Sequence, residues 1–309
     1  MSRLVGTLAI AVASTVCACS QKEAAKPDSA AVAQAGAPGA PSAAAASKGS
    51  FDPTTHVVVA HAKDFAFETP DSITAGWTTF HLVNDGPNLH HLQIVRLDSG
   101  KTVADFGAAM QASDKNHTPP PSWIVFAGGP NAPSPKAESE ATIDMQPGNY
   151  VLLCFVDIPN HVPHFTKGML RPLTVTAAAG GPAAEPTADV TVTLADYSFT
   201  TAGATTAGKH TFKIVNKGPQ AHEIEVVRLA PGKTMKDVNE FMEKAYAGKV
   251  DGPPPLDAIG GIAGMAPGMT QYFTADLTPG NYVLLCFVPD AKDGKPHLEH
   301  GMVKEFSVK

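Results

Sequence analysis

The sequence has few charged residues and no block of one sign. Lys and Arg number 23 and Asp and Glu number 29, which gives a formal net charge of -6. Charged residues make up 17% of the chain, below the roughly 25% typical of soluble proteins. A basic surface that could hold a phosphate backbone is therefore missing, and we expect no nucleic-acid partner.

The sequence also lacks a long apolar run. After Arg3, the run Leu4–Val16 covers about 13 residues, whereas a membrane-spanning helix needs about 20. This pattern is typical of a signal peptide. The run ends in Val16-Cys17-Ala18-Cys19, which resembles the lipobox of bacterial lipoproteins and implies that Cys19 is acylated; an ordinary secreted protein cut after Ala18 is the alternative.

Either cleavage predicts an exported protein. The lipobox resemblance implies a cell-envelope lipoprotein that faces the periplasm or the cell surface. Ser20 follows Cys19, in place of the acidic residue that often retains lipoproteins at the inner membrane. This favours the outer membrane, if the organism has one.

Large apolar side chains are nearly absent from two segments, which predicts flexible linkers. We expect a signal peptide at 1–18, an Ala/Pro/Gly/Ser tether at 19–50 and a linker at 178–188. Two domains of similar length remain, at 51–177 (the first repeat) and 189–309 (the second repeat).

The two repeats are copies of each other. VNDGPNLH at 83–90 aligns with VNKGPQAH at 215–222, and PGNYVLLCFV at 147–156 recurs letter for letter at 279–288, always 132 residues further on. Alternating apolar residues and Asn-x-Gly-Pro or Pro-Gly-Asn turns predict strands in both copies. An apolar stripe predicts one helix ahead of the cysteine in each copy. The predicted fold is an all-β antiparallel sandwich with a helix-containing insertion, made twice.

Cysteine is scarce, and its placement is informative. Four cysteines are too few for a disulfide scaffold of this size, and beyond the leader each repeat has one. Only two of the histidine registers recur between the copies, and a methionine lies five places after the second of them. The recurring residues are His90, Cys154, His164 and Met169 in the first repeat, and His222, Cys286, His297 and Met302 in the second.

Two histidines, a cysteine and a methionine are the ligand set of a type 1 copper site, in which the thioether is a weak axial ligand. Here the sequence resembles the cupredoxins, the blue copper proteins, through NxGPxxH, PGxYxxxC and the Cys-His-Met loop. The resemblance implies a Greek-key β-sandwich, up to two type 1 coppers and electron transfer. It assigns the eight recurring residues as ligands. His161 and His300 remain competing candidates for the loop ligand, and in both repeats His91 or Glu223 stands where the family often has Asn.

Other interpretations of these residues stay open. Each cysteine could be a buried small hydrophobic residue, or Cys154 and Cys286 could form a disulfide between the repeats. The histidines could cap turns, and the methionines could fill the core.

The sequence predicts a protein that is not an enzyme. Copper nitrite reductases and multicopper oxidases connect the type 1 site to a catalytic copper through a histidine next to the cysteine, and the oxidases have His-x-His pairs. Here Leu and Phe flank both cysteines, and the chain has no His-x-His pair.

The expected function is electron transfer by a membrane-tethered protein with two blue copper sites. Its expected partners are redox proteins of the periplasm or membrane, and the membrane itself through the lipid anchor. Copper storage, delivery or tolerance is one alternative, and a cupredoxin-fold interaction module with empty sites is another.

Overall fold

The computed structural model describes residues 49–309, apart from 99, 117, 160 and 179–183. Residues 49–309 belong to one compact unit. The signal peptide, Cys19 and nearly all of the expected tether lie outside the described residues. None of the helices within the described residues is long and apolar enough to cross a membrane.

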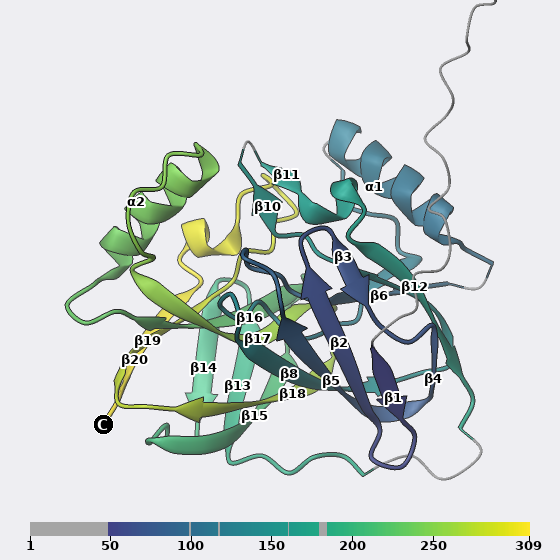
Figure 1. Cartoon of the computed structure of the whole chain (residues 1–309), viewed down its shortest axis with the longest axis horizontal. Helices are drawn as coiled ribbons and strands as arrows, with labels where there is room; N and C mark the ends of the chain where they lie inside the picture. Colours follow the sequence, from purple (N-terminus) through teal and green to yellow (C-terminus); the bar gives the residue numbers. More distant parts are fainter. Residues whose placement is uncertain (1–48, 99, 117, 160, 179–183) are drawn as a thin grey trace, which may run out of the picture. The chain divides into compact units, whose positions relative to one another are not determined.

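The first repeat contains strands, one α-helix and a 3-10 turn (Figure 1). In chain order these are β1 (Ser50–Asp52), β2 (Val57–Lys63), β3 (Ala66–Glu68), β4 (Ser72–Thr74), β5 (Gly76–Asn84), β6 (Gln93–Leu97), α1 (Val103–Asn116), β7 (Ile124–Phe126), β8 (Glu138–Met145), β9 (Gly148–Leu153), β10 (Asp157–Ile158), β11 (Val162–Pro163), η1 (His164–Lys167) and β12 (Leu170–Thr176).

The second repeat follows the same order with fewer short strands. Its elements are β13 (Val190–Ala195), β14 (Ser198–Ala202), β15 (Gly208–Asn216), β16 (His222–Leu229), α2 (Met235–Tyr246), β17 (Leu256–Met265), β18 (Thr270–Leu277), β19 (Gly280–Leu285), η2 (His297–His300) and β20 (Val303–Val308).

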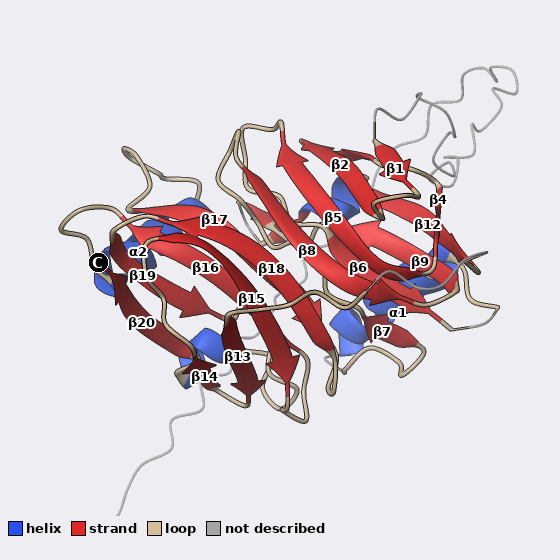
Figure 2. Ribbon diagram, turned by 90° about the horizontal axis from the view of Figure 1, so that it is seen from below, coloured by secondary structure: helices blue, strands red, loops and turns tan. Residues whose placement is uncertain are grey.

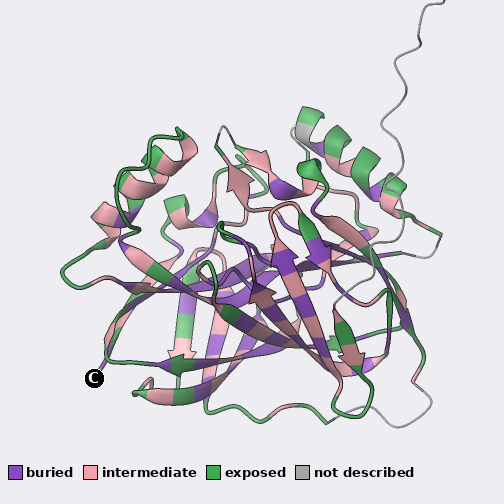
Figure 3. Cartoon of the chain, in the orientation of Figure 1, coloured by how far each residue is buried: buried purple, intermediate pink, exposed green. Residues whose placement is uncertain are grey.

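Each repeat is a two-layer sandwich. In the first, strands β1, β2, β3, β5 and β8 form one layer, and the sheet β4-β12-β9-β6-β7 forms the other. In the second, β13, β14, β15 and β18 face the sheet β17-β16-β19-β20. The strand β5 alternates between buried and half-buried residues, as expected when one face packs on a core (Figure 3). The all-β, cupredoxin-like sandwich predicted from the sequence is confirmed.

The helices cover the outer faces of the two sheets that contain β9 and β19, the strands that lead to the cysteines. Phe106 of α1 and Val238 of α2 are fully buried in separate apolar clusters, with Met110 and Met242 packed against them. This cover explains why the last four residues of β9 and of β19 are buried on both faces. Thr234 and Asp237 form a capping box at the start of α2, an arrangement that stabilises helix N-termini.

The two repeats share backbone hydrogen bonding, which the sequence did not predict. Strands β8 and β18 lie side by side, so that one nine-stranded sheet contains strands of both repeats (Figure 2). Further antiparallel bridges join Ala127 to Met265, Pro130 to Ile262 and Pro133 to Ile259. Polar side chains such as Gln93, whose Nε2 donates to the Gly264 carbonyl at 2.8 Å, complete this interface.

The recurring Gly-Gly pairs allow two kinds of close approach. A Cβ at Gly128 or Gly260 would collide with a side chain of the other repeat, that of Gln271 or of Ser139. The second glycine of each pair lies against the backbone of its own repeat. Gly129 and Gly261 have φ values of +124° and +139°, and a Cβ at either would collide with a backbone carbonyl, that of Leu92 or of Ile224. Only glycine can adopt this positive φ and also leave room for the carbonyl oxygen at low cost.

Gly261→Ala is therefore expected to destabilise the protein by more than about 3 kcal/mol, because it adds a backbone collision to an unfavourable φ. The control is Gly268→Ala, where φ is +81° but a Cβ meets nothing within 4 Å, so the cost should stay near 1–2 kcal/mol. Urea unfolding followed by circular dichroism measures both changes. Equal losses of stability would contradict this account.

Candidate metal centres

The Asn-x-Gly-Pro motif fixes the first histidine of each repeat. Asn84 accepts a hydrogen bond from the Gly86 amide at 3.0 Å and donates to the Asn88 carbonyl at 2.8 Å, which closes the turn after β5. The His90 ring packs so tightly on Gly86 that a Cβ there would lie 2.7 Å from Nε2. Asn216, Gly218 and His222 repeat the arrangement. The motif therefore serves to orient the imidazole.

The cysteine loop brings the second histidine back to the cysteine. Cys154 follows the end of β9, and its carbonyl accepts a hydrogen bond from the Phe165 amide at 2.9 Å. The His164 amide donates to the Val156 carbonyl, also at 2.9 Å. In the second repeat, the Leu298 and His297 amides bond in the same way to the carbonyls of Cys286 and Val288.

Three ligand atoms converge in the first repeat. His90 Nδ1 lies 3.1 Å from His164 Nδ1, and Cys154 Sγ lies 3.5 Å from His164 Nδ1. All three side chains are buried, with exposures between 0 and 1%. Together with Met169 we call these residues the first centre.

The second repeat has the same cluster. His222 Nδ1 and His297 Nδ1 are 3.0 Å apart, and Cys286 Sγ lies 3.5 Å from His297 Nδ1 and 4.0 Å from His222 Nδ1. Within each cluster, the candidate ligand atoms of the two histidines and the cysteine all lie within 4.8 Å of one another. These three residues and Met302 are the second centre.

The methionines lie beside these clusters. Met169 is fully buried in the same apolar core as Cys154, and its backbone bonds to His164 O at 3.3 Å and to the Cys154 amide at 3.2 Å. Met302 is fully buried with Cys286, and its amide bonds to His297 O at 3.0 Å.

The structure separates the competing loop histidines from the cysteines. His161 stacks on Tyr246 of α2, with ring centroids 4.4 Å apart, and its side chain is 68% exposed. His300 Nε2 lies 3.2 Å from Asp293 Oδ1. Both cysteines are free, so a disulfide between the repeats is not formed.

An aspartate behind each first histidine was missed by the sequence analysis. Asp64 Oδ1 lies 2.9 Å from His90 Nε2, and Asp196 Oδ1 lies 2.9 Å from His222 Nε2. A carboxylate partner holds the proton on Nε2 and leaves the Nδ1 lone pair free for a metal. The two aspartates are 132 residues apart, so the repeat offset was a signal that could have found them.

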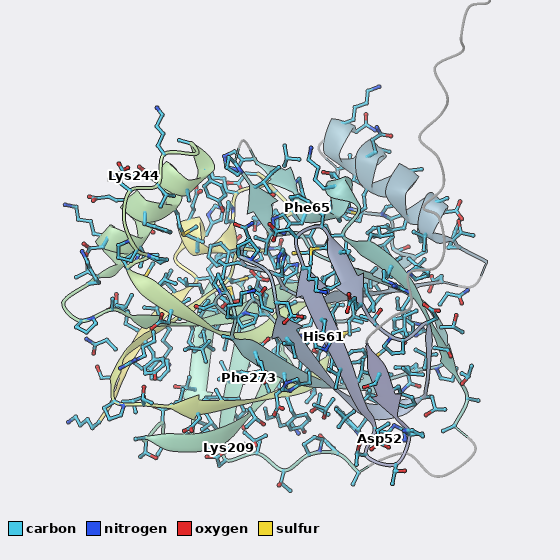
Figure 4. The ribbon with its side chains drawn as sticks, in the orientation of Figure 1. Asp52, His61, Phe65, Lys209, Lys244 and Phe273 are labelled. Carbon is cyan, nitrogen blue, oxygen red and sulfur yellow. The ribbon has the colours of Figure 1, made fainter. Side chains whose placement is uncertain are left out.

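An aromatic residue next to each aspartate covers the second histidine. Phe65, labelled in Figure 4, lies edge-on to His164 at 5.3 Å, and Tyr197 lies edge-on to His297 at 5.5 Å. Both have positive φ, 63° and 61°, which is uncommon for large residues. A tight turn after β2 and after β13 thus presents an acid to one imidazole and a ring to the other.

His91 and Glu223 hold the backbone beside the cysteines. His91 Nε2 accepts from the Phe155 amide at 2.8 Å, and Glu223 Oε1 accepts from the Phe287 amide at 2.7 Å. Burial lowers the pKa of His91 to about 4, against a hydrogen bond with Asn131 that raises it. Burial raises the pKa of Glu223 to about 7, against hydrogen bonds from Phe287 and Asn131. A histidine in the first repeat and a glutamate in the second thus accept the same backbone hydrogen bond at equivalent positions.

The second centre has an additional acid. The Asp290 side chain is buried and accepts hydrogen bonds from the Tyr197 hydroxyl at 2.6 Å and from Gln220 Nε2 at 2.9 Å. Its Oδ2 lies 3.7 Å from His297 Nε2. These hydrogen bonds hold the pKa of Asp290 well below its usual range. In the first repeat the position equivalent to Asp290 is occupied by Ile158. The first centre therefore has no acid at this position.

The residues fit a copper ion. Burial, followed by the neighbouring His90, lowers the pKa of His164 to about 4, and burial also lowers the pKa of the other three histidines. Neutral imidazoles are the form that binds metals. Two imidazole nitrogens, one thiol sulfur and an adjacent methionine are the donors of a blue copper site. Copper is the metal that this set of donors fits in both repeats.

No known protein family matches the chain, and no curated protein matches its sequence. Similar solved structures include reduced auracyanin from Roseiflexus castenholzii, with 20% identity over 40% of this chain and 97% of that chain, at a TM-score of 0.28. A multicopper oxidase is 11% identical over 86% of this chain and 94% of its own, at a TM-score of 0.26. The blue copper oxidase of Nitrosomonas europaea is 14% identical over 81% and 85%, at a TM-score of 0.24.

These similarities correct one prediction. The sequence lacks His-x-His pairs and a histidine beside either cysteine, which predicted a protein that is not an enzyme. Two of the similar structures are copper oxidases that match most of this chain. The exclusion of enzymes is therefore wrong, because a motif search cannot exclude activity for a fold that oxidases also have.

Burial raises the pKa of Cys154 to about 12 and raises that of Cys286 as well. In copper-free protein 49–309 at pH 8, both thiols should react with Ellman's reagent about a thousandfold more slowly than an ordinary cysteine, because the thiolate is the reactive form. Unfolding in guanidinium chloride should restore fast reaction of two thiols. Rapid reaction of either thiol in the folded protein would contradict the buried site.

Proposed function

We propose that this protein is an exported electron-transfer protein with two type 1 copper sites, one in each repeat. The ligands are His90, Cys154, His164 and Met169 in the first centre, and His222, Cys286, His297 and Met302 in the second. The observation that carries the proposal is that the same buried, preassembled His-Cys-His cluster occurs twice.

Preassembly favours electron transfer over copper storage or delivery. Backbone hydrogen bonds fix the loop of each cysteine, and a carboxyl group fixes one imidazole of each centre. A site held in this way needs little rearrangement when copper changes its oxidation state. A storage or delivery site, by contrast, needs exposed ligands for exchange, whereas these histidines and cysteines are at most 1% exposed.

The chemistry of each residue follows from its contacts. When bound, copper supplies a one-electron redox couple. The two sulfur atoms and two imidazoles accept both oxidation states, since soft sulfur suits Cu(I) and imidazole suits either state. Asp64 and Asp196 hold the proton on Nε2 of His90 and His222, and the apolar core around the cysteines excludes water.

The cellular setting is part of the proposal. The signal-peptide pattern and the lipobox at Cys19 support a lipoprotein of the cell envelope, with the segment 19–50 as a tether and 178–188 as the linker between domains 51–177 and 189–309. Redox proteins of the periplasm or membrane are the partners that such a location would provide.

Copper titration tests the proposal directly. Protein 49–309 titrated with Cu(II) should develop an intense thiolate-to-copper charge-transfer band that saturates near two equivalents. Cys154→Ser and Cys286→Ser should each remove one equivalent and leave the other centre intact, because each cluster lies within one repeat. Absence of any visible band would refute the electron-transfer function, and loss of both bands in one variant would refute the independence of the centres.

Because only the second centre has a buried acid at the position of Asp290, we expect the two centres to have unequal reduction potentials. A negative charge beside His297 stabilises Cu(II) more than Cu(I) and lowers the potential of the second centre. Asp290→Asn should therefore raise that potential and leave the first centre unchanged in a redox titration of the visible bands. Asp293→Asn is the matched control, because this neighbouring acid bonds to His300 rather than to a copper ligand. A fall in potential, or an equal rise at both centres, would contradict the role of Asp290.

A further inference from the structure

One buried residue of the first repeat connects the surroundings of the two centres. Asn131 lies in the loop between β7 and β8 and is 3% exposed. Its Nδ2 lies 3.5 Å from Glu223 Oε2 and 3.4 Å from the Ile224 carbonyl. The carbonyl of Pro130, which precedes Asn131 in the chain, accepts a hydrogen bond from the Leu92 amide at 3.0 Å. Asn131 and this peptide group therefore join His91-Leu92, the segment that follows His90, to Glu223, the residue after His222.

The two ends of this connection lead to the cysteines. His91 Nε2 accepts from the Phe155 amide at 2.8 Å, and Phe155 follows Cys154 in the chain. Glu223 Oε1 accepts from the Phe287 amide at 2.7 Å, and Phe287 follows Cys286. Hydrogen bonds and covalent bonds thus run without a break from one cysteine to the other. We call His91, Asn131 and Glu223 the Asn131 bridge.

We propose that the Asn131 bridge couples the two centres and carries electron exchange between them. This proposal rests on the proposed function, since it requires a redox metal in both centres. The balance is one electron: one centre is oxidised by one electron as the other is reduced by one. No bond forms or breaks, and no external oxidant is needed.

Burial and chemistry both favour the bridge as a route. His91, Asn131 and Glu223 are 7%, 3% and 6% exposed, so water does not compete for their hydrogen bonds, and such bonds are stronger in a low-dielectric interior. Electron tunnelling decays less steeply through covalent and hydrogen bonds than across gaps between non-bonded atoms. The bridge therefore offers better coupling than contacts between non-bonded atoms, and its path to the second cysteine differs from that of the backbone hydrogen bonds in the same interface, such as the one from the Asn131 amide to the Gly261 carbonyl at 3.1 Å.

The bridge depends on a single residue. The repeat offset relates Asn131 to Ala263, whose methyl group cannot form hydrogen bonds. The interface is otherwise built from equivalent pairs, such as Ala127 with Met265 and Pro133 with Ile259. A substitution at Asn131 therefore removes the side-chain contact with Glu223, and Ala263 offers no equivalent contact to replace it.

The test variant is Asn131→Leu, which keeps the side-chain size and removes the amide. Asn131→Ser, too short to reach both partners, replaces it if the leucine variant does not fold. The control is Ser139→Ala, because Ser139 Oγ donates to the Asn131 carbonyl at 2.7 Å in the same buried interface but does not contact the bridge side chains.

The first measurement uses copper-free protein 49–309. Hydrogen exchange of the Phe287 amide, followed by NMR, should become at least tenfold faster in Asn131→Leu, because Glu223 loses the group that orients it, whereas exchange of the Phe155 amide should stay within about twofold. Ser139→Ala should leave both exchange rates within about twofold. Unchanged exchange of the Phe287 amide in Asn131→Leu would mean that the bridge does not form, which overturns the proposal.

The second measurement uses protein with both centres loaded. After pulsed reduction by less than one equivalent, electron redistribution is followed by freeze-quench EPR, with the Cys154→Ser and Cys286→Ser proteins as reference spectra for the single centres. A rate independent of protein concentration is expected. It should fall at least tenfold in Asn131→Leu and remain unchanged in Ser139→Ala.

The outcomes separate the two proposals. If neither centre binds copper in the titration, the proposed function fails. If both centres bind copper and redistribution is equally fast in Asn131→Leu, the bridge is only structural and the coupling proposal fails alone. Equal slowing in Ser139→Ala would assign the effect to the interface in general and would also overturn the role of Asn131.

Discussion

Burial of one thiol between two neutral imidazoles is the constraint on which each repeat depends. Cys154 and Cys286 have no exposed surface, and without a partner a buried thiol stays protonated. The strand before the cysteine, the returning loop and the Asn-x-Gly-Pro turn all place nitrogen atoms around this sulfur. The same elements seal the core, so the requirements of packing and of metal binding coincide in these residues.

The two repeats keep this arrangement and vary what surrounds it. Both have an aspartate on the first histidine and an aromatic ring on the second. Only the second has a buried acid at Asp290 near its loop histidine. His91 and Glu223 perform the same hydrogen bond with different chemistry. Equal ligands in unequal surroundings are a means of giving two copper sites different potentials, because the outer contacts tune the metal.

The interface between the repeats makes the protein more than two copies of one domain joined by a linker. Strands β8 and β18 join in one sheet, and the glycine pairs allow the insertion of each repeat to pack against the other. This packing buries His91, Asn131 and Glu223 together between the two centres. A linker alone would let the two centres move independently, whereas a shared interface fixes the position of one centre relative to the other.

Much of the centre was predictable because its signals are local or repeated. The strands followed from alternation, and the helices followed from the stripes at Phe106 and Val238, both of which are buried. The eight proposed ligands followed from recurrence in the two repeats, at an offset of 132 residues for the first histidine and the cysteine and of 133 for the second histidine and the methionine. The structure brings His90, Cys154 and His164 together as it does their second-repeat counterparts. The exclusion of enzymes was wrong, because a missing motif says little about an activity.

The sequence by itself determined the sandwich fold, its duplication and the residues that gather around each cysteine, because alternation and repeat spacing encode them directly. Only the tertiary structure decided that His164 and His297, rather than His161 and His300, lie against the cysteines. It also decided that Asp64 and Asp196 lie behind the imidazoles, and that Asn131 meets Glu223. These contacts join residues 26 and 92 positions apart, and only the packing of strands and repeats in space brings such residues together.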